Sequence, residues 1–328
     1  MQFLRSADSF PGESAPVETI ETHFAWIFLT RRFAYKLKKP LRFRRVDLRD
    51  INARKTSCEL EDTLNRRLAE AVYIGVVPLT LRRRKLYLED HGEPVDWLVK
   101  MHRLRHDRML DAAARAGTVQ KADLEAVLGK LAGFYRHTSR AQWNGSDYVH
   151  HLIRQIHETR AQLTEPGLGL DINSIDVIVA RQSDFVQREA ACLEDRADQQ
   201  HVVDAHGDLK PEHVFLDKNP QIIDCLEFST ELRWLDTAEE ISFLALECER
   251  LGHADVAAEI LALYRDATDD SVPARLLDFY RSQRALARAM LSAWRLAEME
   301  ADPAAPAWLE RTRWYLDIAA KSMARALS

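Results

Sequence analysis

The stretch HGDLKPEHVFLD (206–217) joins a polar, acid-containing loop directly to an apolar run. The turn-forming trio KNP (218–220) and a second apolar run, QIID (221–224), follow it, and together they predict a short β-hairpin. Asp208 then lies in the loop before the hairpin and Asp224 at its end, and we expect both carboxylates to face one cleft. Such a pair suits Mg²⁺, which prefers oxygen ligands and shares its shell with phosphate and water. Either acid alone could be a turn or cap residue, so the prediction depends on the ordered set.

This ordered set resembles the signature of the aminoglycoside phosphotransferase-like branch of the protein-kinase-like fold. That family has a catalytic loop of the form HGDLxxxN, then a strand and an IDW-type triplet, to which HGDLKPEH and IIDC correspond here. Further on, LDTAEEISFL (235–244) resembles the family's GDPxxDLA segment and places Asp236 and Glu240 on its two acids. The resemblance extends into the first hundred residues. FAYKLKKP resembles the strand that bears the nucleotide lysine, most simply Lys36, and ELEDTLNRRL resembles the helix whose glutamate, here Glu61, pairs with that lysine.

Within this family, the stretches LNRRLAEAVYIGVVPL and DCLEFSTELRWLD are closest to an uncharacterised bacterial subfamily. Some of its members carry an additional C-terminal domain with its own P-loop. This chain has no GxxxxGK motif followed by Ser or Thr, so we expect it to be the kinase-like module alone.

The resemblance implies phosphoryl transfer from ATP, which needs positioning and charge neutralisation more than covalent catalysis. Asp208 would accept or orient the proton of the attacking hydroxyl, and Asp224 would hold Mg²⁺ against the phosphates. Lys36, fixed by Glu61, would contact the α- and β-phosphates. Adenine would lie against the hinge strand VDWLVKMHRL. The residues that complete this predicted site are Val99 and Met101 beside adenine, and His206, Glu212, Glu227, Asp236 and Glu240 in supporting positions around the catalytic loop and metal.

Periodicity divides the chain into a β-rich beginning and a helical remainder. Residues 1–20 are rich in Pro, Ser and acid and predict a loose or short-helical lead-in. The runs FAWIFLT, FAYKLKKP, GVVPLTLRRR, KLYLED and VDWLVKMHRL predict strands. SCELEDTLNRRLAEAV predicts one amphipathic helix, in which Leu60, Leu64 and Leu68 share a face.

Helical patterns dominate from about residue 104. They include a continuous helix over 231–252 and three helices in the tail (254–328), with ADPAAP (301–306) as the break between the last two. We therefore predict an α+β, bilobal protein-kinase-like fold. A small antiparallel β lobe with one helix would occupy 21–103. A large, mainly helical lobe with the catalytic loop and the acceptor-binding region would occupy 104–328.

Two positions depart from the family pattern. His213 replaces the family's metal-binding Asn, and imidazole is a poorer ligand for Mg²⁺ than for softer divalent ions such as Mn²⁺. His213 could bind Mn²⁺, could donate a hydrogen bond to a phosphate or to Asp208, or could leave the metal to Glu212. The hairpin that would cover the phosphates has Arg31 and Arg32 at its tip instead of glycine. These guanidiniums could contact phosphate directly, or the turn could be an exposed, solvated one.

Composition narrows the class of protein. The net charge is −5, so we expect no nucleic-acid partner. Basic residues are in excess between 31 and 110 and acidic residues between 200 and 250, which could place a polyanion beside a metal-collecting acidic cluster, or the basic surface could simply be solvated. The four cysteines are widely spaced, which predicts reduced thiols rather than a disulfide framework or zinc site. The beginning of the chain lacks a signal-peptide pattern and no apolar run is long enough for a membrane span, so we expect a cytoplasmic protein.

The predicted function is ATP-dependent transfer of the γ-phosphate to a hydroxyl of an unidentified small molecule, with Mg²⁺, or Mn²⁺ as the alternative. A different class of function stays open. The chain could be a weak or inactive nucleotide-binding regulatory module, which His213 and the missing glycine favour and the intact Lys36, Glu61, Asp208 and Asp224 oppose. A protein-directed kinase or nucleotidyltransferase is a third reading.

Overall fold

The structure is a computed structural model that describes residues 2–44, 46–165, 167–297 and 304–328. The chain divides into two compact units, each made of two segments. The first unit comprises Met1–Lys130 and Pro211–Leu232, and the second comprises Leu131–Lys210 and Arg233–Ser328. The stretch HGDLKPEH is therefore shared, with Asp208 in the second unit and His213 in the first.

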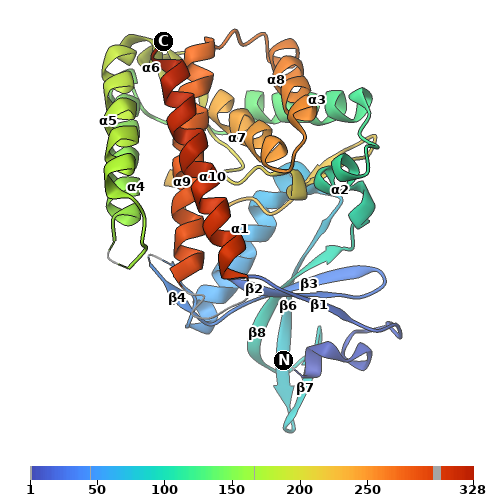
Figure 1. Ribbon diagram of the computed structural model, residues 1–328. Helices are drawn as coiled ribbons and strands as arrows, with labels where there is room; N and C mark the ends of the chain where they lie inside the picture. Colours follow the sequence, from blue (N-terminus) through green and yellow to red (C-terminus); the bar gives the residue numbers. More distant parts are fainter. Residues whose placement is uncertain (1, 45, 166, 298–303) are drawn as a thin grey trace. The chain divides into compact units, whose positions relative to one another are not determined.

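The first unit is built on a six-stranded antiparallel sheet in the order β1-β2-β3-β8-β6-β7 (Figure 1). Its strands are β1 (Glu18–Glu21), β2 (Ala25–Leu29), β3 (Phe33–Lys38), β6 (Tyr73–Arg82), β7 (Lys85–Leu88) and β8 (Glu93–His102). Five of these are the strands predicted from alternation. The turn between β6 and β7 consists of Arg83 and Arg84, both with positive φ, as a two-residue hairpin turn of the right-handed twist requires.

The lead-in takes the short-helical form of the two that were predicted. Two short 3₁₀ helices (Phe3–Arg5 and Ala7–Ser9) precede β1, and Leu4 and Phe10 are buried in the core of the sheet with Phe28. The prediction of a lead-in without a strand was wrong at 18–20, because these residues belong to β1, a mostly exposed edge strand whose sequence, ETIE, lacks apolar alternation.

Helix α1 (Ile51–Ala69) lies across β6 and β8 of the sheet (Figure 1). It begins earlier than predicted because the Asp50 carboxylate accepts hydrogen bonds from the backbone N–H groups of Asn52 and Ala53. Its inward face is partly polar: Leu64 and Leu68 are buried as predicted, but Leu60 is 39% exposed and Glu61 is fully buried.

The remaining elements of the first unit are short. They are β4 (Arg42–Phe43), β5 (Val46–Asp47), a 3₁₀ turn (His106–Arg108), α2 (Leu110–Arg115), a second 3₁₀ turn (Pro211–His213), β10 (Val214–Phe215) and β11 (Gln221–Ile222). Strands β10 and β11 pair antiparallel, which confirms the hairpin predicted around KNP. Helix α3 (Lys121–His137) begins in the first unit and continues into the second.

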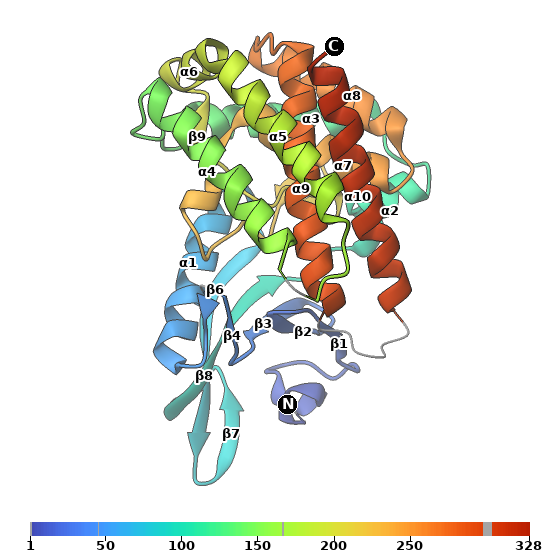
Figure 2. The same ribbon diagram turned by 60° about the vertical axis from the view of Figure 1, so that its left-hand side comes forward.

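The second unit is mainly helical, as predicted. Its helices are α4 (Gly145–Leu163), α5 (Ile172–Arg188), α6 (Ala190–Asp198), α7 (Thr237–Arg250), α8 (Ala254–Thr268), α9 (Ala274–Ala297) and α10 (Ala305–Ala326). Helix α9 packs against both α7 and α10, and α9 and α10 run side by side (Figure 2). The predicted break at 301–306 lies partly outside the described residues.

The helix predicted over 231–252 begins only at Thr237. A 3₁₀ turn (Glu231–Arg233) and strand β12 (Trp234–Asp236) precede it, and β12 pairs antiparallel with β9 (Val202–Asp204). This pairing of distant segments outweighs the local helical pattern.

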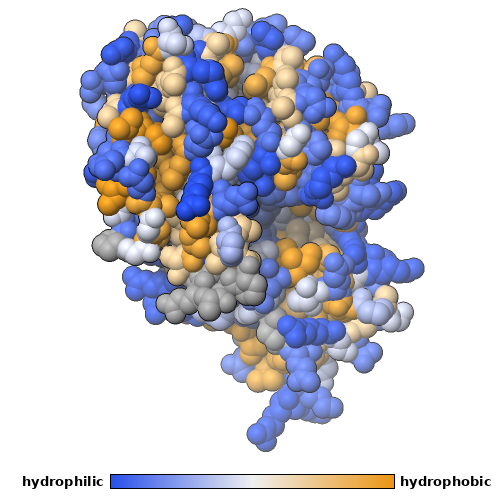
Figure 3. Space-filling view, viewed as in Figure 1, coloured by the Kyte–Doolittle hydropathy of each residue, from blue (hydrophilic) through white to orange (hydrophobic). Residues whose placement is uncertain are grey.

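Hydrophilic and hydrophobic side chains are interspersed over the surface that Figure 3 shows. None of the helices in the described ranges has both the length and the apolar character needed to cross a membrane.

Candidate active site

Lys36 of β3 lies between two carboxylates of the first unit. Its Nζ atom is 2.8 Å from Oε1 of Glu61, on α1, and 2.6 Å from Oδ1 of Asp224. Burial alone would lower the pKa of Lys36, but the carboxylates of Asp224, Glu61 and Glu227 raise it well above its ordinary value. The ammonium therefore stays charged, and the predicted Lys36–Glu61 ion pair is present.

Lys38, two residues further along β3, belongs to the same cluster. Its Nζ atom donates to Oε2 of Glu61 at 2.6 Å and to Oε1 of Glu227 at 2.5 Å. Burial would raise the pKa of Glu61, but Lys36 and Lys38 together lower it. Sequence reasoning missed Lys38, although the i, i+2 spacing of the two lysines on one strand puts them on the same face.

Asp224 follows β11 in a strained backbone conformation. Its φ is +62°, in the left-handed region that a non-glycine residue seldom adopts. The backbone N–H of Asp224 donates to the hydroxyl of Tyr73 at 3.3 Å, and the next N–H, of Cys225, donates to Oδ1 of Asn65 at 2.8 Å. Strain that neighbouring contacts maintain is typical of functional positions.

His213 is brought next to Asp224, with its Nε2 atom 3.3 Å from Oδ2. The imidazole is 9% exposed and the carboxylate 44% exposed, so Asp224 is open to a ligand. One carboxylate oxygen and one imidazole nitrogen fit a divalent cation that completes its shell with phosphate and water, and they suit Mn²⁺ better than Mg²⁺. The described residues contain no group of three or more His, Cys, Asp or Glu side chains arranged to hold a metal ion by themselves. Glu212 is half-buried in the same 3₁₀ turn as His213.

The two arginines at the β2–β3 turn are exposed. Nε of Arg32 is 3.3 Å from Oε1 of Glu13, and its guanidinium lies over the Phe33 ring at 5.1 Å. The side chain of Arg32 thus pairs with a residue of the lead-in segment.

Val99 and Met101 are buried in β8 and form part of one apolar cluster of the first unit. Strands β3 and β6 pair with the two sides of Val99, opposite Lys36 and Val76. The partly exposed members of this cluster are Ile27, Leu29, Val76, Trp97, Leu104 and Ile223. The cluster therefore places accessible apolar side chains on the same sheet as Lys36.

In the second unit, Asp208 lies in a loop that Glu240 of α7 holds in place. The backbone N–H groups of His206 and Gly207 donate to the Glu240 carboxylate at 3.2 and 2.6 Å, and the hydroxyl of Tyr135 donates to it at 2.8 Å. Gly207 has a φ of +87°, which glycine adopts without a steric cost. His206 is fully buried, and its Nδ1 atom accepts the N–H of Asp208 at 3.4 Å.

Asp236 has a different role from Glu240. It caps α7 by accepting the N–H of Ala238 at 2.8 Å, and it accepts two hydrogen bonds from Arg196, both 2.7 Å long. Asp236 therefore fixes the beginning of the helix that carries Glu240.

Sequence reasoning also missed a group of arginines on α9, two of which lie near the Asp208 loop. Arg281, Arg284 and Arg288 recur at i, i+3 and i+7 on α9, a spacing that puts them on one helix face. Nη2 of Arg284 donates to the carbonyl oxygen of Gly207 at 3.1 Å, and Nη1 of Arg288 is 3.8 Å from Oδ1 of Asp208. Lys210 is closer, with Nζ 2.9 Å from Oδ2 of the same carboxylate.

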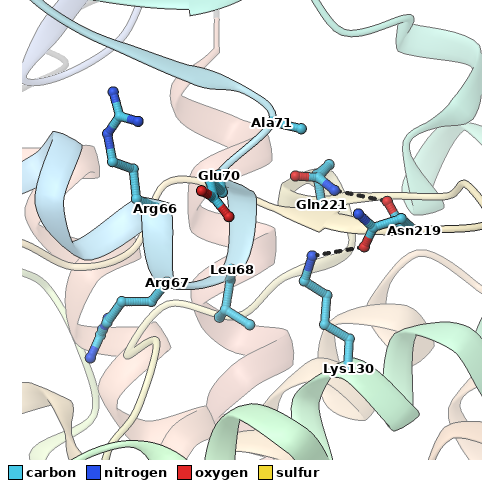
Figure 4. Close-up of a pocket in the computed structure, with 8 residues that line it drawn as sticks. All are labelled: Arg66, Arg67, Leu68, Glu70, Ala71, Lys130, Asn219 and Gln221. Atoms are coloured by element: carbon cyan, nitrogen blue, oxygen red, sulfur yellow. Dashed lines mark hydrogen bonds between the residues drawn. The ribbon is translucent and has the colours of Figure 1, made fainter.

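Each unit also contains a cavity. One, of about 390 Å³, is at the C-terminal end of α1, where Lys130 reaches Asn219 and Arg66 and Arg67 extend to opposite sides of the helix (Figure 4). The other, of about 350 Å³, lies in the second unit beside Asp270. None of the sequence-predicted site residues lines either of them in the described part of the chain.

No protein-family model matches this chain. An uncharacterised protein of Mycobacterium tuberculosis (strain H37Rv) is 32% identical over 313 residues, which are 92% of this chain and 60% of that protein. An uncharacterised protein of Mycobacterium bovis matches with the same identity and coverage. The chain thus spans about 60% of the length of these curated relatives.

Several solved structures are similar to this chain. A choline kinase from Streptococcus pneumoniae superposes with a TM-score of 0.55 at 14% identity, over 94% of each chain. A choline/ethanolamine kinase family protein from Mesorhizobium loti gives 0.52 at 14% identity over 98% of each chain. An aminoglycoside phosphotransferase from Streptomyces rimosus, solved with ADP and streptomycin, gives 0.50 at 13% identity over 84% of this chain and 94% of its own. These likenesses confirm the predicted kinase-like fold and the resemblance to this group of structures.

Proposed function

We propose that this protein is an ATP-dependent phosphotransferase that moves the γ-phosphate to a hydroxyl of a small molecule. The observation that supports this most is Lys36, a largely buried ammonium that Glu61 and Asp224 keep charged. A fixed cation beside an accessible carboxylate is what binding of a nucleotide triphosphate with a divalent ion needs. The fold supports the proposal because its neighbours are named as choline, ethanolamine and aminoglycoside kinases.

In this proposal the first unit binds the nucleotide. Lys36 contacts the α- and β-phosphates, and adenine packs on the accessible apolar side chains of the cluster that contains Val99 and Met101. Asp224 and His213 would hold the divalent cation, which would supply neutralisation of the phosphate charge. Because Lys36 is 2.6 Å from Oδ1 of Asp224, the phosphates would draw its ammonium away and release that oxygen for the cation.

Asp208 serves the acceptor. The acceptor oxygen attacks the γ-phosphorus and forms an O–P bond, while the bond from that phosphorus to the β–γ bridging oxygen breaks. The hydroxyl proton passes to the Asp208 carboxylate, and ADP leaves. Glu240 keeps the Asp208 loop in place through its two backbone hydrogen bonds.

A nucleotide-binding regulatory module is the second candidate. It is favoured by the engagement of both Asp224 oxygens, one by Lys36 and the other by His213. A module of this kind would bind ATP without turnover, and replacing His213 by Asn would not restore any.

The test is to measure ADP release and metal-dependent ATP binding in three proteins, with a panel of alcohols as acceptors. The wild type is expected to release ADP with at least one acceptor. Asp208→Asn should abolish release but retain ATP binding, whereas Asp224→Ala should abolish both. Full activity of either variant overturns the proposal. Mass spectrometry of the protein after incubation with ATP identifies a self-modifying enzyme by an added phosphate or AMP.

A further inference from the structure

The second unit gathers three arginines, Arg284, Arg288 and Arg311, near the carboxylates of Asp208, Glu239 and Glu247. Arg284 and Arg288 of α9 stack on the Phe243 ring of α7, with guanidinium carbons 4.4 and 5.7 Å from its centroid. Arg311 of α10 lies over Trp308 at 5.1 Å. The side chains of these three arginines are 14 to 24% exposed, so they are largely buried but reach the surface.

The carboxylates next to Arg288 already have closer partners. Asp208 is paired with Lys210 at 2.9 Å, and the buried Glu247 is paired with Arg250 at 2.9 Å and accepts a hydrogen bond from the Tyr315 hydroxyl. Arg288 is 3.8 Å from Asp208 and 3.7 Å from Glu247, both beyond ordinary hydrogen-bond length. Neither carboxylate therefore forms a close ion pair with Arg288.

Arg196, in the same unit, is an example of a buried arginine whose guanidinium nitrogens are all hydrogen-bonded to carboxylates. It is 8% exposed and donates four hydrogen bonds of 2.5 to 2.8 Å to Asp236 and Asp270. Arg288 is 14% exposed, and its Nε atom is buried without a hydrogen-bond partner in the described ranges. The Nε atoms of Arg284 and Arg311 are also buried without a hydrogen-bond partner in the described ranges. Buried polar atoms are almost always hydrogen-bonded, so these three neighbouring Nε donors have hydrogen-bonding capacity left for an anion.

We propose that the acceptor is an alcohol that carries an anionic group, a carboxylate or a phosphate monoester, which Arg288 and its neighbours Arg284 and Arg311 bind beside Asp208. This inference rests on the proposed phosphotransferase function and names its substrate class. Guanidinium forks match the two oxygens of a carboxylate or phosphate. A cationic acceptor such as an amino alcohol would meet these arginines with like charge and be disfavoured.

The experiment compares acceptors that share a carbon skeleton and differ in charge. Glycerol is paired with glycerate and glycerol 3-phosphate, and glucose with gluconate and glucose 6-phosphate, while choline and streptomycin represent cations. The measurement is ADP release with ATP and Mg²⁺ or Mn²⁺, together with ³¹P NMR of the product. At least one anionic member should exceed its neutral counterpart in kcat/KM by about tenfold or more, since hydrogen bonds to a charged group discriminate by that amount. Comparing the carboxylates with the phosphate monoesters in the panel shows which of the two anionic groups the site prefers.

Two variants test whether Arg288 is responsible. Arg288→Met should raise KM for the anionic acceptor about 10- to 100-fold and leave KM for ATP unchanged, and Arg288→Lys should restore part of the loss. Arg325→Met, on α10, is the matched control because Arg325 pairs with Asp278 on the surface. It should leave both KM values unchanged.

The outcomes separate this inference from the proposed function. Preferred turnover of a neutral or cationic acceptor overturns the inference and leaves the phosphotransferase intact, as does an Arg288→Met enzyme that behaves like Arg325→Met. If the wild type binds no ATP, the proposed function fails. In that case, calorimetric titration with the same anionic compounds tests whether the arginines bind an anion. Equal affinities of the wild type and Arg288→Met for these compounds would overturn the inference.

Discussion

The ammonium of Lys36 is nearer to Asp224 than to Glu61, at 2.6 against 2.8 Å. Glu61 has a second cation, Lys38, at 2.6 Å, whereas the Asp224 carboxylate is 44% exposed. The two ends of this cluster therefore differ: Glu61 is buried between two lysines, whereas the Asp224 carboxylate is partly exposed to solvent.

Mutation of Lys36 should affect ATP binding, whereas mutation of Lys38 should affect stability. Lys36→Met is expected to abolish ATP binding with little loss of stability, because Glu61 keeps Lys38. Lys38→Met should retain ATP binding but lower the free energy of unfolding by about 3 to 5 kcal/mol, since Glu61 keeps Lys36 but the largely buried Glu227 carboxylate loses its ion pair with Lys38. Equilibrium ATP titration and urea denaturation of both variants measure the two effects. Loss of ATP binding in a fully folded Lys38→Met protein would contradict this division.

His213 should set the metal preference. We expect wild type to bind ATP more tightly with Mn²⁺ than with Mg²⁺, because imidazole nitrogen suits the softer ion. His213→Asn supplies an amide oxygen and should shift the preference toward Mg²⁺. Titration of ATP in the presence of each metal tests this. An unchanged Mn²⁺ to Mg²⁺ ratio in the variant would mean that His213 is not a ligand.

The loop of Asp208 depends on Glu240 for two backbone hydrogen bonds. Glu240→Ala leaves the N–H groups of His206 and Gly207 without an acceptor and should lower the free energy of unfolding by about 3 kcal/mol, at 1 to 3 kcal/mol for each buried group. Tyr135→Phe removes only one hydrogen bond to the same carboxylate and should cost about 1 kcal/mol. Urea denaturation compares them, and equal losses would show that the loop does not depend on these bonds.

Glu239 should make stability depend on pH. Burial raises the pKa of Glu239 to about 7, against a partial offset by Arg284. Since the folded pKa lies above the ordinary value of 4.5, the folded state binds more protons between these values, and stability declines as pH rises from 4.5 to about 7. Glu239→Gln removes this dependence, so its stability relative to wild type should increase by up to about 3 kcal/mol over that range. Urea denaturation at pH 5, 6, 7 and 8 measures the change, and a constant difference between the proteins would refute it.

Strands with clear alternation and the loop–hairpin motif could be predicted from the sequence because their signals are local. The ETIE strand and the β12–β9 pair could not, since the first is a polar edge and the second joins segments about thirty residues apart. The predicted helix over 231–252 was wrong at its start for the same reason.

The candidate site divides in a similar way. Sequence motifs with a recognisable order along the chain were enough to predict four members of the candidate site: Lys36, Glu61, Asp208 and Asp224. The arginines of α9 recur at helical intervals, but their significance depends on which carboxylates already have partners, and that is decided only by packing. Lys38 became part of the cluster because Glu227 also reaches it.

Residues 211–232 belong to the first unit although residues 131–210 belong to the second, and this order matters during translation. Lys36 leaves the ribosome 188 residues ahead of Asp224, so the sheet is synthesised long before its lysine has a second counter-ion. A fragment that stops at residue 130 would contain every strand of the sheet and neither Asp224 nor the β10–β11 hairpin. A single cut after residue 130 or after residue 210 would therefore separate Lys36 and Glu61 from Asp224, whereas a cut after residue 232 would keep them in one fragment.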